Sequence, residues 1–217
     1  MAYRKSSAIG DLHGRVENIV FRTRNGKNIA YARPVNQKIP DSQKAKNTRA
    51  NFAAANSFSS FVNSAPALQT VWSVAKVRGS NAYQRMVSMN TRLARNGSLT
   101  TSNVITPPGQ LLKLNSVSIE DKMILLSFLC PGNAYISFPA SLFVYLYFGK
   151  SDGSIAPLMV EVPEPEPDGV YEINVVPDVE TKRLLGKDPS PLVFIALTGG
   201  KVYKKKVYWT STVGAAL

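Results

Sequence analysis

The residues on which most enzymes and metal sites depend are scarce in this sequence. Its 217 residues include one histidine, His13, and one cysteine, Cys130. A disulfide within the chain is excluded, and a zinc site of the Cys/His kind cannot be built from one copy. A Ser-His-Asp, Cys-His or His-metal enzyme would have to rely on His13 alone. We therefore predict that the protein is not an enzyme and binds no metal or cofactor.

Two short motifs and the cysteine are interpreted as structural. Gly10-Asp11-Leu12-His13-Gly14 is similar to the first metal-binding motif of metallophosphoesterases, but the further aspartates and histidines that hold two cations are missing. We interpret it as a turn. Gly149-Lys150-Ser151 is similar to the end of a P-loop, but Val144 stands where that loop needs glycine. Cys130 ends an apolar run, which is typical of a buried thiol.

Charge is distributed unevenly along the chain. Residues 1–100 contain 16 lysines and arginines against 3 acids, whereas residues 101–217 contain 10 against 11. A surface with such an excess attracts polyanions, with an affinity that falls as salt rises. A basic surface can also serve an acidic partner protein or solubility alone. The residues that we expect to bind a polyanion or a partner are Arg15, Arg22, Arg24, Lys27, Arg33, Lys44, Lys46, Arg49, Arg78 and Arg85.

The change in charge coincides with a stretch of turn-forming residues. Asn96-Gly97-Ser98 and Thr106-Pro107-Pro108-Gly109 are rich in residues typical of linkers. We therefore predict a basic hairpin-helix domain at residues 1–100 and a second domain at residues 101–217.

The first half begins with a pattern typical of a hairpin. Val16–Thr23 and Lys27–Arg33 are two strand-like runs, and Asn25-Gly26 lies between them. Asn-Gly suits the type I′ turn, which needs positive φ at both central positions.

Three helices are predicted to follow the hairpin. Asp41 is the expected N-cap of a helix of roughly twenty residues, in which apolar positions recur every three or four residues. These positions are Ala45, Thr48, Phe52, Ala55, Phe58 and Val62. A second helix should begin at Pro66, and a third should span about Asn81–Leu93. The expected buried residues of these two helices are Leu68, Val71, Trp72, Ala75, Tyr83, Met86, Val87 and Leu93.

The second half changes to short apolar runs separated by turns, with no segment long enough for an amphipathic helix. The runs are Leu111–Val117, Met123–Cys130, Ala134–Phe138, Leu142–Phe148, Leu158–Val162, Val170–Val175, Leu192–Leu197 and Val202–Trp209. This pattern indicates an antiparallel, immunoglobulin-like β-sandwich. Glu161–Pro167 contains three prolines, so it should form a sheet edge or an extended loop. The fold class predicted for the whole chain is α+β, with an N-terminal β-hairpin plus helices.

Both termini contain apolar residues that could be ordered by a neighbour. They are Tyr3, Ala8-Ile9 and the last five residues, Val213–Leu217. Terminal segments fray unless something holds them, and exposed sheet edges accept added strands. We therefore expect these segments to pair with the sheet edge of a neighbouring copy.

Another pattern of the first half is the spacing of a few residues over about residues 10–95. They are Gly14, Val16, Gly26-Lys27, Ala32-Arg33-Pro34, Asp41, Gln43, Arg49, Phe52, Trp72, Gly79, Asn81-Ala82-Tyr83, Val87 and Asn90. In this spacing the first half resembles a family of short basic proteins found in Bacteroidota and their phages. The function of that family is uncharacterised, so the resemblance implies no catalytic residue. It implies a hairpin, a helical segment and a β-rich C-terminal domain, and it favours a virus-linked or assembly role.

Together these patterns favour a non-enzymatic structural or assembly subunit of a virion or filament. Its expected partners are copies of itself, other virion proteins and nucleic acid. The alternative is a nucleic-acid-binding protein that uses residues 1–100 as a sequence-independent clamp. The sequence has neither a run of 18 apolar residues nor an N-terminal signal pattern. We therefore expect synthesis in the cytoplasm and a final location in the assembled particle.

Overall fold

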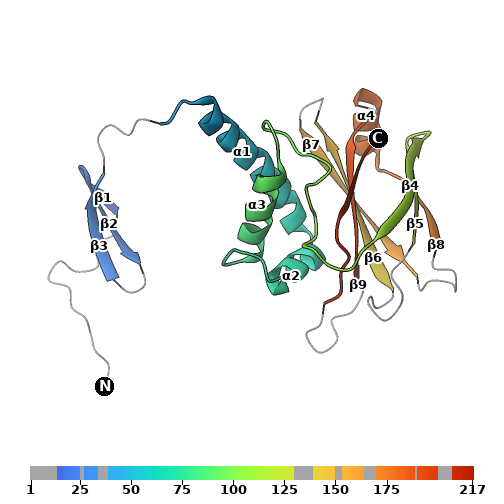
Figure 1. The fold of residues 1–217 in the computed structure, drawn as a ribbon, viewed down its shortest axis with the longest axis horizontal. Helices are drawn as coiled ribbons and strands as arrows, with labels where there is room; N and C mark the ends of the chain where they lie inside the picture. The colour runs from blue at the N-terminus through green and yellow to red at the C-terminus, as the bar shows by residue number, and fades with distance from the viewer. Residues whose placement is uncertain are drawn as a thin grey trace, which may run out of the picture. The chain divides into compact units, whose positions relative to one another are not determined.

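The computed structural model describes residues 14–24, 27–33, 39–129, 139–149, 153–163, 170–188, 190–199 and 207–217 (Figure 1). The chain is α+β and divides into two compact units, Met1–Asp41 and Ser42–Leu217. The boundary predicted between residues 100 and 101 lies within the second unit. Several sequence predictions lie outside the described residues: those on Tyr3, Ala8-Ile9, residues 10–13, Cys130, residues 134–138, Lys150-Ser151, residues 164–167 and residues 202–206.

The first unit contains a three-stranded antiparallel sheet. Its strands are β1 (Gly14–Val16), β2 (Ile19–Arg24) and β3 (Lys27–Ala32), in the order β1-β2-β3. Arg24 pairs with Lys27 at the ends of β2 and β3, so the hairpin predicted around Asn25-Gly26 is confirmed. The predicted strand that began at Val16 is two strands, because Glu17 turns the chain with a φ of 47°.

The second unit begins with three helices: α1 (Gln43–Ser64), α2 (Pro66–Val74) and α3 (Ala82–Leu93). The predicted starts of α2 at Pro66 and of α3 after Asn81 are confirmed, and the Asn81 side chain accepts a hydrogen bond from the Gln84 N–H at 2.8 Å. The N-cap predicted at Asp41 is wrong by one residue. Ser42 is the cap, because its Oγ accepts a bond from the Ala45 N–H.

In the described ranges after α3, seven strands form two antiparallel sheets (Figure 1). The four-stranded sheet has the order β10-β9-β6-β7, and the three-stranded sheet has the order β4-β5-β8. The strands are β4 (Lys113–Glu120), β5 (Met123–Leu129), β6 (Ala140–Phe148), β7 (Ser154–Val162), β8 (Val170–Val175), β9 (Leu192–Gly199) and β10 (Val213–Ala216). Among the described strands of its sheet, β7 lies at an edge, as predicted for its last two residues, Glu161 and Val162.

Strand β6 explains why the helices and the sheets form one unit. Leu142, Val144, Leu146 and Phe148 belong to a core that also contains residues of β5 and β9, so the two sheets share it. Phe143, Tyr145 and Tyr147 alternate with them and belong to a second core, which contains Phe58, Trp72 and Met86 of the helices. Because neighbouring side chains of a strand point to opposite faces, both faces of β6 are covered. The second core therefore contains side chains from both sides of residue 100.

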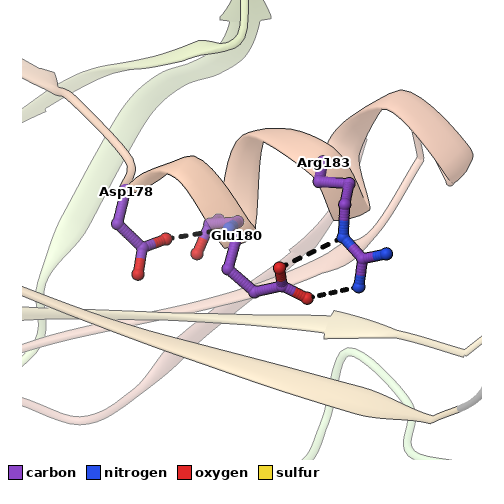
Figure 2. A network of polar contacts seen from close by, with 4 residues as sticks. Asp178, Glu180 and Arg183 are labelled. Atoms are coloured by element: carbon purple, nitrogen blue, oxygen red, sulfur yellow. Dashed lines mark hydrogen bonds and ion pairs between the residues drawn. The ribbon is translucent and has the colours of Figure 1, made fainter.

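One element of the second half, a helix, was not expected from the sequence. A helix, α4 (Val179–Lys187), lies between β8 and β9, and its Leu184 and Leu185 are buried in the core shared by the two sheets. Asp178 caps it by accepting a hydrogen bond from the Thr181 N–H at 2.8 Å, and Glu180 forms an ion pair with Arg183 (Figure 2). This helix was missed because nine residues contain too few repeats to reveal a helical period.

The C-terminal residues complete the chain's own sheet. β10 pairs with β9 in antiparallel register, with Val213 opposite Ile195 and Ala216 opposite Leu192. The Thr212 hydroxyl before β10 accepts bonds from the backbone N–H groups of Ile105 and Thr106, at 2.9 and 2.8 Å. Residues 213–216 are therefore ordered by pairing within the chain, and β10 lies at the edge of its sheet; the expectation that this tail pairs with a neighbouring copy stays a prediction.

Candidate functional site

The helical part of the second unit is strongly basic. The sequence contains no acidic residue from Ser42 to Ile119, whereas it contains nine lysines and arginines there. Repulsion among these cations is therefore not offset by acids of the same segment. An ion pair among the described residues, Glu180 with Arg183, lies in α4 and not in this segment. This segment supplies the positive potential from which the site is built.

The basic residues predicted in the first unit lie in its three strands, except Arg33, which directly follows β3. Arg15, Arg22 and Arg33 are exposed, and the side chains of Arg24 and Lys27 lie outside the described residues. Arg15 donates from Nε to the Glu17 carbonyl oxygen at 2.6 Å. The Arg22 guanidinium carbon lies 5.2 Å from the centre of the Tyr31 ring, which is a cation–π contact across β2 and β3.

The basic residues predicted in the second unit fall into separate groups. Lys44, Lys46 and Arg49 are exposed on the first two turns of α1, and Arg78 is exposed in the connection between α2 and α3. Arg85, in contrast to these four residues, is half-buried.

Arg85 is engaged within the fold. Its Nη1 donates to the carbonyl oxygens of Trp72 and Ser73, at 2.8 and 2.5 Å, and its Nε donates to the Gly79 oxygen at 3.2 Å. The Trp72 and Ser73 carbonyls belong to the last turn of α2, where a cation is favourable because of the helix dipole. The guanidinium therefore holds the end of α2 to α3.

Helices α1 and α3 run antiparallel and are joined at two places. The Tyr83 hydroxyl donates to Oδ1 of Asn56 at 2.7 Å. Toward the start of α1, Nδ2 of Asn51 donates to the Ala94 oxygen at 3.0 Å, and Oδ1 of Asn51 accepts from the Gly97 N–H at 2.7 Å. These side-chain bonds fix the separation of the two helices at both ends of the surface between them.

The stretch predicted to be a linker supplies one of these joints. Asn96 and Gly97 both have positive φ, 48° and 78°, and Arg95 and Ser98 on either side form a bridge with two backbone hydrogen bonds. This is the geometry of a type I′ turn. A Cβ at Gly97 would lie 3.0 Å from Cβ of Ala50, so a glycine allows the close approach of the turn to α1.

A groove of about 440 Å³ lies between α1 and α3. It is lined by side chains of both helices, which are Phe52, Asn56, Tyr83, Gln84, Val87, Ser88, Thr91 and Arg92. Arg49 lies three residues before Phe52 on α1, and Arg92 lies in the last turn of α3. Because the helices are antiparallel, with Asn51 bonded to Ala94, Arg49 and Arg92 flank the same end of the groove.

Phe52 is the residue of this groove whose environment differs most from the sequence prediction. It belongs to the apolar series of α1, but 52% of its surface is exposed, whereas Ala55, Phe58 and Val62 are buried. Only the C-terminal half of α1 contributes buried side chains to the helical core, so Phe52 lies beyond it. Phe52 and Arg92 were not among the predicted binding residues, because their proximity depends on the packing of α1 against α3.

Two further cavities lie in the second unit. One of about 350 Å³ is polar and includes Thr70, Ser73, Asn81 and Arg85. The other, of about 260 Å³, lies between the start of α2 and strands β6 and β7, beside the exposed Met159. In the part of the chain that the structure describes, no three or more His, Cys, Asp or Glu side chains are grouped so that they could hold a metal ion.

The comparisons with known proteins found no family model and no curated protein that matches this chain. Among the helices of the described ranges, none has both the length and the apolar character needed to span a bilayer.

Proposed function

We propose that the protein is a non-enzymatic assembly subunit of a virion or filament. In this proposal its basic N-terminal half contacts acidic neighbours or nucleic acid, and its partners include copies of the same chain and other virion proteins. The resemblance of residues 10–95 to short basic phage-associated proteins is consistent with this role. The observation that carries the proposal is the exposure of the small sheet in the first unit.

Among the residues of β1–β3 whose burial is described, none is buried. Val16 is 62% exposed, Ile19 is 46% exposed and Tyr31 is 40% exposed. A sheet of three short strands buries little apolar surface by itself, so these exposed side chains are available to a partner surface. The exposed Arg15, Arg22 and Arg33 favour a partner surface that is acidic.

The β-rich part supports the proposal of an immunoglobulin-like sandwich. One sheet consists of β4, β5 and β8, which are the first, second and fifth strands from β4 onward. The other has the order β7-β6-β9-β10, which are the fourth, third, sixth and seventh. In immunoglobulin domains strands A, B and E share one sheet, while C, F and G share the other, to which variable domains add C′. In this proposal β4-β5-β8 correspond to A-B-E, and β7-β6-β9-β10 correspond to C′-C-F-G. This topology concerns the fold and assigns no activity.

The assembly proposal is tested by light scattering and negative-stain electron microscopy of the full-length protein. We expect a particle mass that exceeds one chain and grows with concentration. Val16→Ser and Ile19→Ser together should reduce it, because both remove exposed apolar surface that is available to a partner. The matched control is Val74→Ser with Leu111→Ser, which are 47% and 73% exposed in the second unit. A wild-type protein that stays monomeric at every concentration contradicts the proposal.

A second candidate function is a sequence-independent nucleic-acid clamp formed by residues 1–100. The observation that favours it is the absence of acids from Ser42 to Ile119, because this segment itself has no carboxylate that would repel a polyanion. Binding of a duplex to the full-length protein, measured over a range of salt concentrations, tests it. A clamp that neutralises several phosphates should show a linear fall of log affinity with log salt, with a slope of about −0.9 for each contact.

A further inference from the structure

The groove between α1 and α3 combines a cationic end, an aromatic wall and a polar opposite end. We propose that it binds single-stranded nucleic acid, with a base against Phe52 and the adjoining phosphates near Arg49 and Arg92. The inference rests on the proposed contact of the basic half with nucleic acid, and it names the place where that contact would be made.

Charge at the groove favours a polyanionic ligand. Arg92 lines it, and Arg49 precedes Phe52 by one turn of α1. Arg95 is folded over the end of α3, since its Nη1 donates to the Arg92 carbonyl oxygen at 2.9 Å, which adds a third guanidinium near this end. The described residues that line the groove include no acid. Guanidinium groups bind phosphate oxygens through paired hydrogen bonds, so this end suits a phosphodiester.

The apolar part of the groove suits an unpaired base. About half of the Phe52 surface is exposed, and the ring lies in a groove that also contains Val87. An aromatic ring beside cations is the common arrangement in proteins that bind single strands, because every base has a face that can stack. The groove volume of about 440 Å³ lies in the range of small-molecule sites.

The opposite end provides polar groups for the edge of a base. Gln84, Ser88 and Asn56 line it, and the Tyr83 hydroxyl is oriented by its bond to Asn56 Oδ1. Amide and hydroxyl groups form hydrogen bonds with base edges that are exposed in single strands and paired in duplexes. The groove should therefore prefer a single strand to a duplex of the same length.

The experiment measures fluorescence anisotropy of a labelled oligothymidine of about ten residues with the full-length protein. Phe52→Ala should weaken binding by about tenfold without changing the salt dependence, since it removes stacking and no charge. Phe61→Ala is the matched control, because Phe61 is on the same helix, is 42% exposed and does not line the groove. Arg92→Ala should weaken binding and reduce the salt slope by about one phosphate contact.

Several results would overturn the inference. One is an equal loss of oligothymidine affinity in Phe52→Ala and Phe61→Ala. Another is an affinity for the duplex that equals the affinity for the single strand. Displacement by polyglutamate that matches displacement by unlabelled oligothymidine would indicate an acidic protein ligand instead. If the wild-type protein binds neither the oligothymidine nor the duplex at low salt, the nucleic-acid contact in the proposed function also fails. The assembly part of the proposed function is tested separately, by light scattering. Thermal unfolding of each variant shows whether the fold is retained.

Discussion

The phenolic oxygen of Tyr83 lies 2.7 Å from Oδ1 of Asn56, and this hydrogen bond joins α3 to α1 beside the groove. A second joint, formed by Asn51 with Ala94 and Gly97, lies nearer the start of α1. Polar side chains thus set the width of a partly apolar surface. Because the two joints lie at different points along α1, each can be removed separately.

We expect Tyr83→Phe to lower the free energy of unfolding by about 1 kcal/mol, since the half-buried bond to Asn56 is lost. The melting temperature should fall by about 2–4 °C for a chain of this size. Denaturant and thermal unfolding measure both quantities. Tyr31→Phe is the control, because Tyr31 is 40% exposed in the first unit and its loss of a hydroxyl should change stability by less than about 0.5 kcal/mol. Equal effects of the two substitutions would contradict the structural role of Tyr83.

Two glycine substitutions should act in opposite directions. Gly97→Ala places a side chain at a φ of +78° and a Cβ 3.0 Å from Ala50, so it should destabilise the protein by about 1–3 kcal/mol. Gly186→Ala adds a Cβ with no atom within 4 Å, on a residue of α4. It should stabilise the protein by about 0.5–1 kcal/mol, because alanine favours a helix more than glycine. Urea unfolding of both variants is the measurement, and a stabilising Gly97→Ala would contradict the turn geometry.

Local signals in the sequence predicted α1, α2 and α3 well. Pro66 and Asn81 mark helix starts through their own backbone and side-chain chemistry, and the periodic residues Trp72 and Met86 are fully buried. The hairpin was predictable for the same reason, since Asn25-Gly26 specifies a turn without help from distant residues.

Long-range packing accounts for what the sequence did not reveal. β6 is apolar at every position from Leu142 to Phe148, so its pattern does not show that one face meets helices and the other meets strands. The predicted domain boundary depended on that missing information. For the candidate site, Arg49 was predicted from charge. Phe52 and Arg92 required knowledge of how α1 meets α3.

Arg85 and Arg78 should differ in their effect on stability, although both were predicted as binding residues from their charge. Arg85→Ala removes three hydrogen bonds to carbonyl oxygens near the end of α2, so it should destabilise the protein by about 1.5–3 kcal/mol. Arg78→Ala alters an exposed side chain and should cost less than about 0.5 kcal/mol. Guanidinium chloride unfolding compares them. Equal costs would show that the bonds of Arg85 contribute nothing to folding.

The capping residue of α4 should make stability depend on acidic pH. Hydrogen bonds from Thr181 hold the pKa of Asp178 below its ordinary value of 3.8, and the bond from Arg183 lowers the pKa of Glu180 in the same helix (Figure 2). A carboxyl whose pKa is lower in the folded state stabilises the fold above its unfolded pKa. The contribution of Asp178 begins to decrease when the pH falls below the ordinary pKa of 3.8. It is lost once the pH has also passed the lower pKa of the folded state, because the folded carboxylate then takes up a proton.

We therefore expect wild type to be more stable than Asp178→Ala at neutral pH, and the difference to narrow as the pH is lowered to about 2.5. Asp178→Asn is the control, because an amide oxygen can still accept the bond from the Thr181 N–H but carries no charge. The difference in the free energy of unfolding between Asp178→Asn and Asp178→Ala should not change over this pH range, since neither variant has a titratable group at position 178. Urea midpoints at a series of pH values give both differences. A gap between wild type and Asp178→Ala that stays constant down to the lowest pH would mean that the charge of Asp178 does not contribute to capping α4.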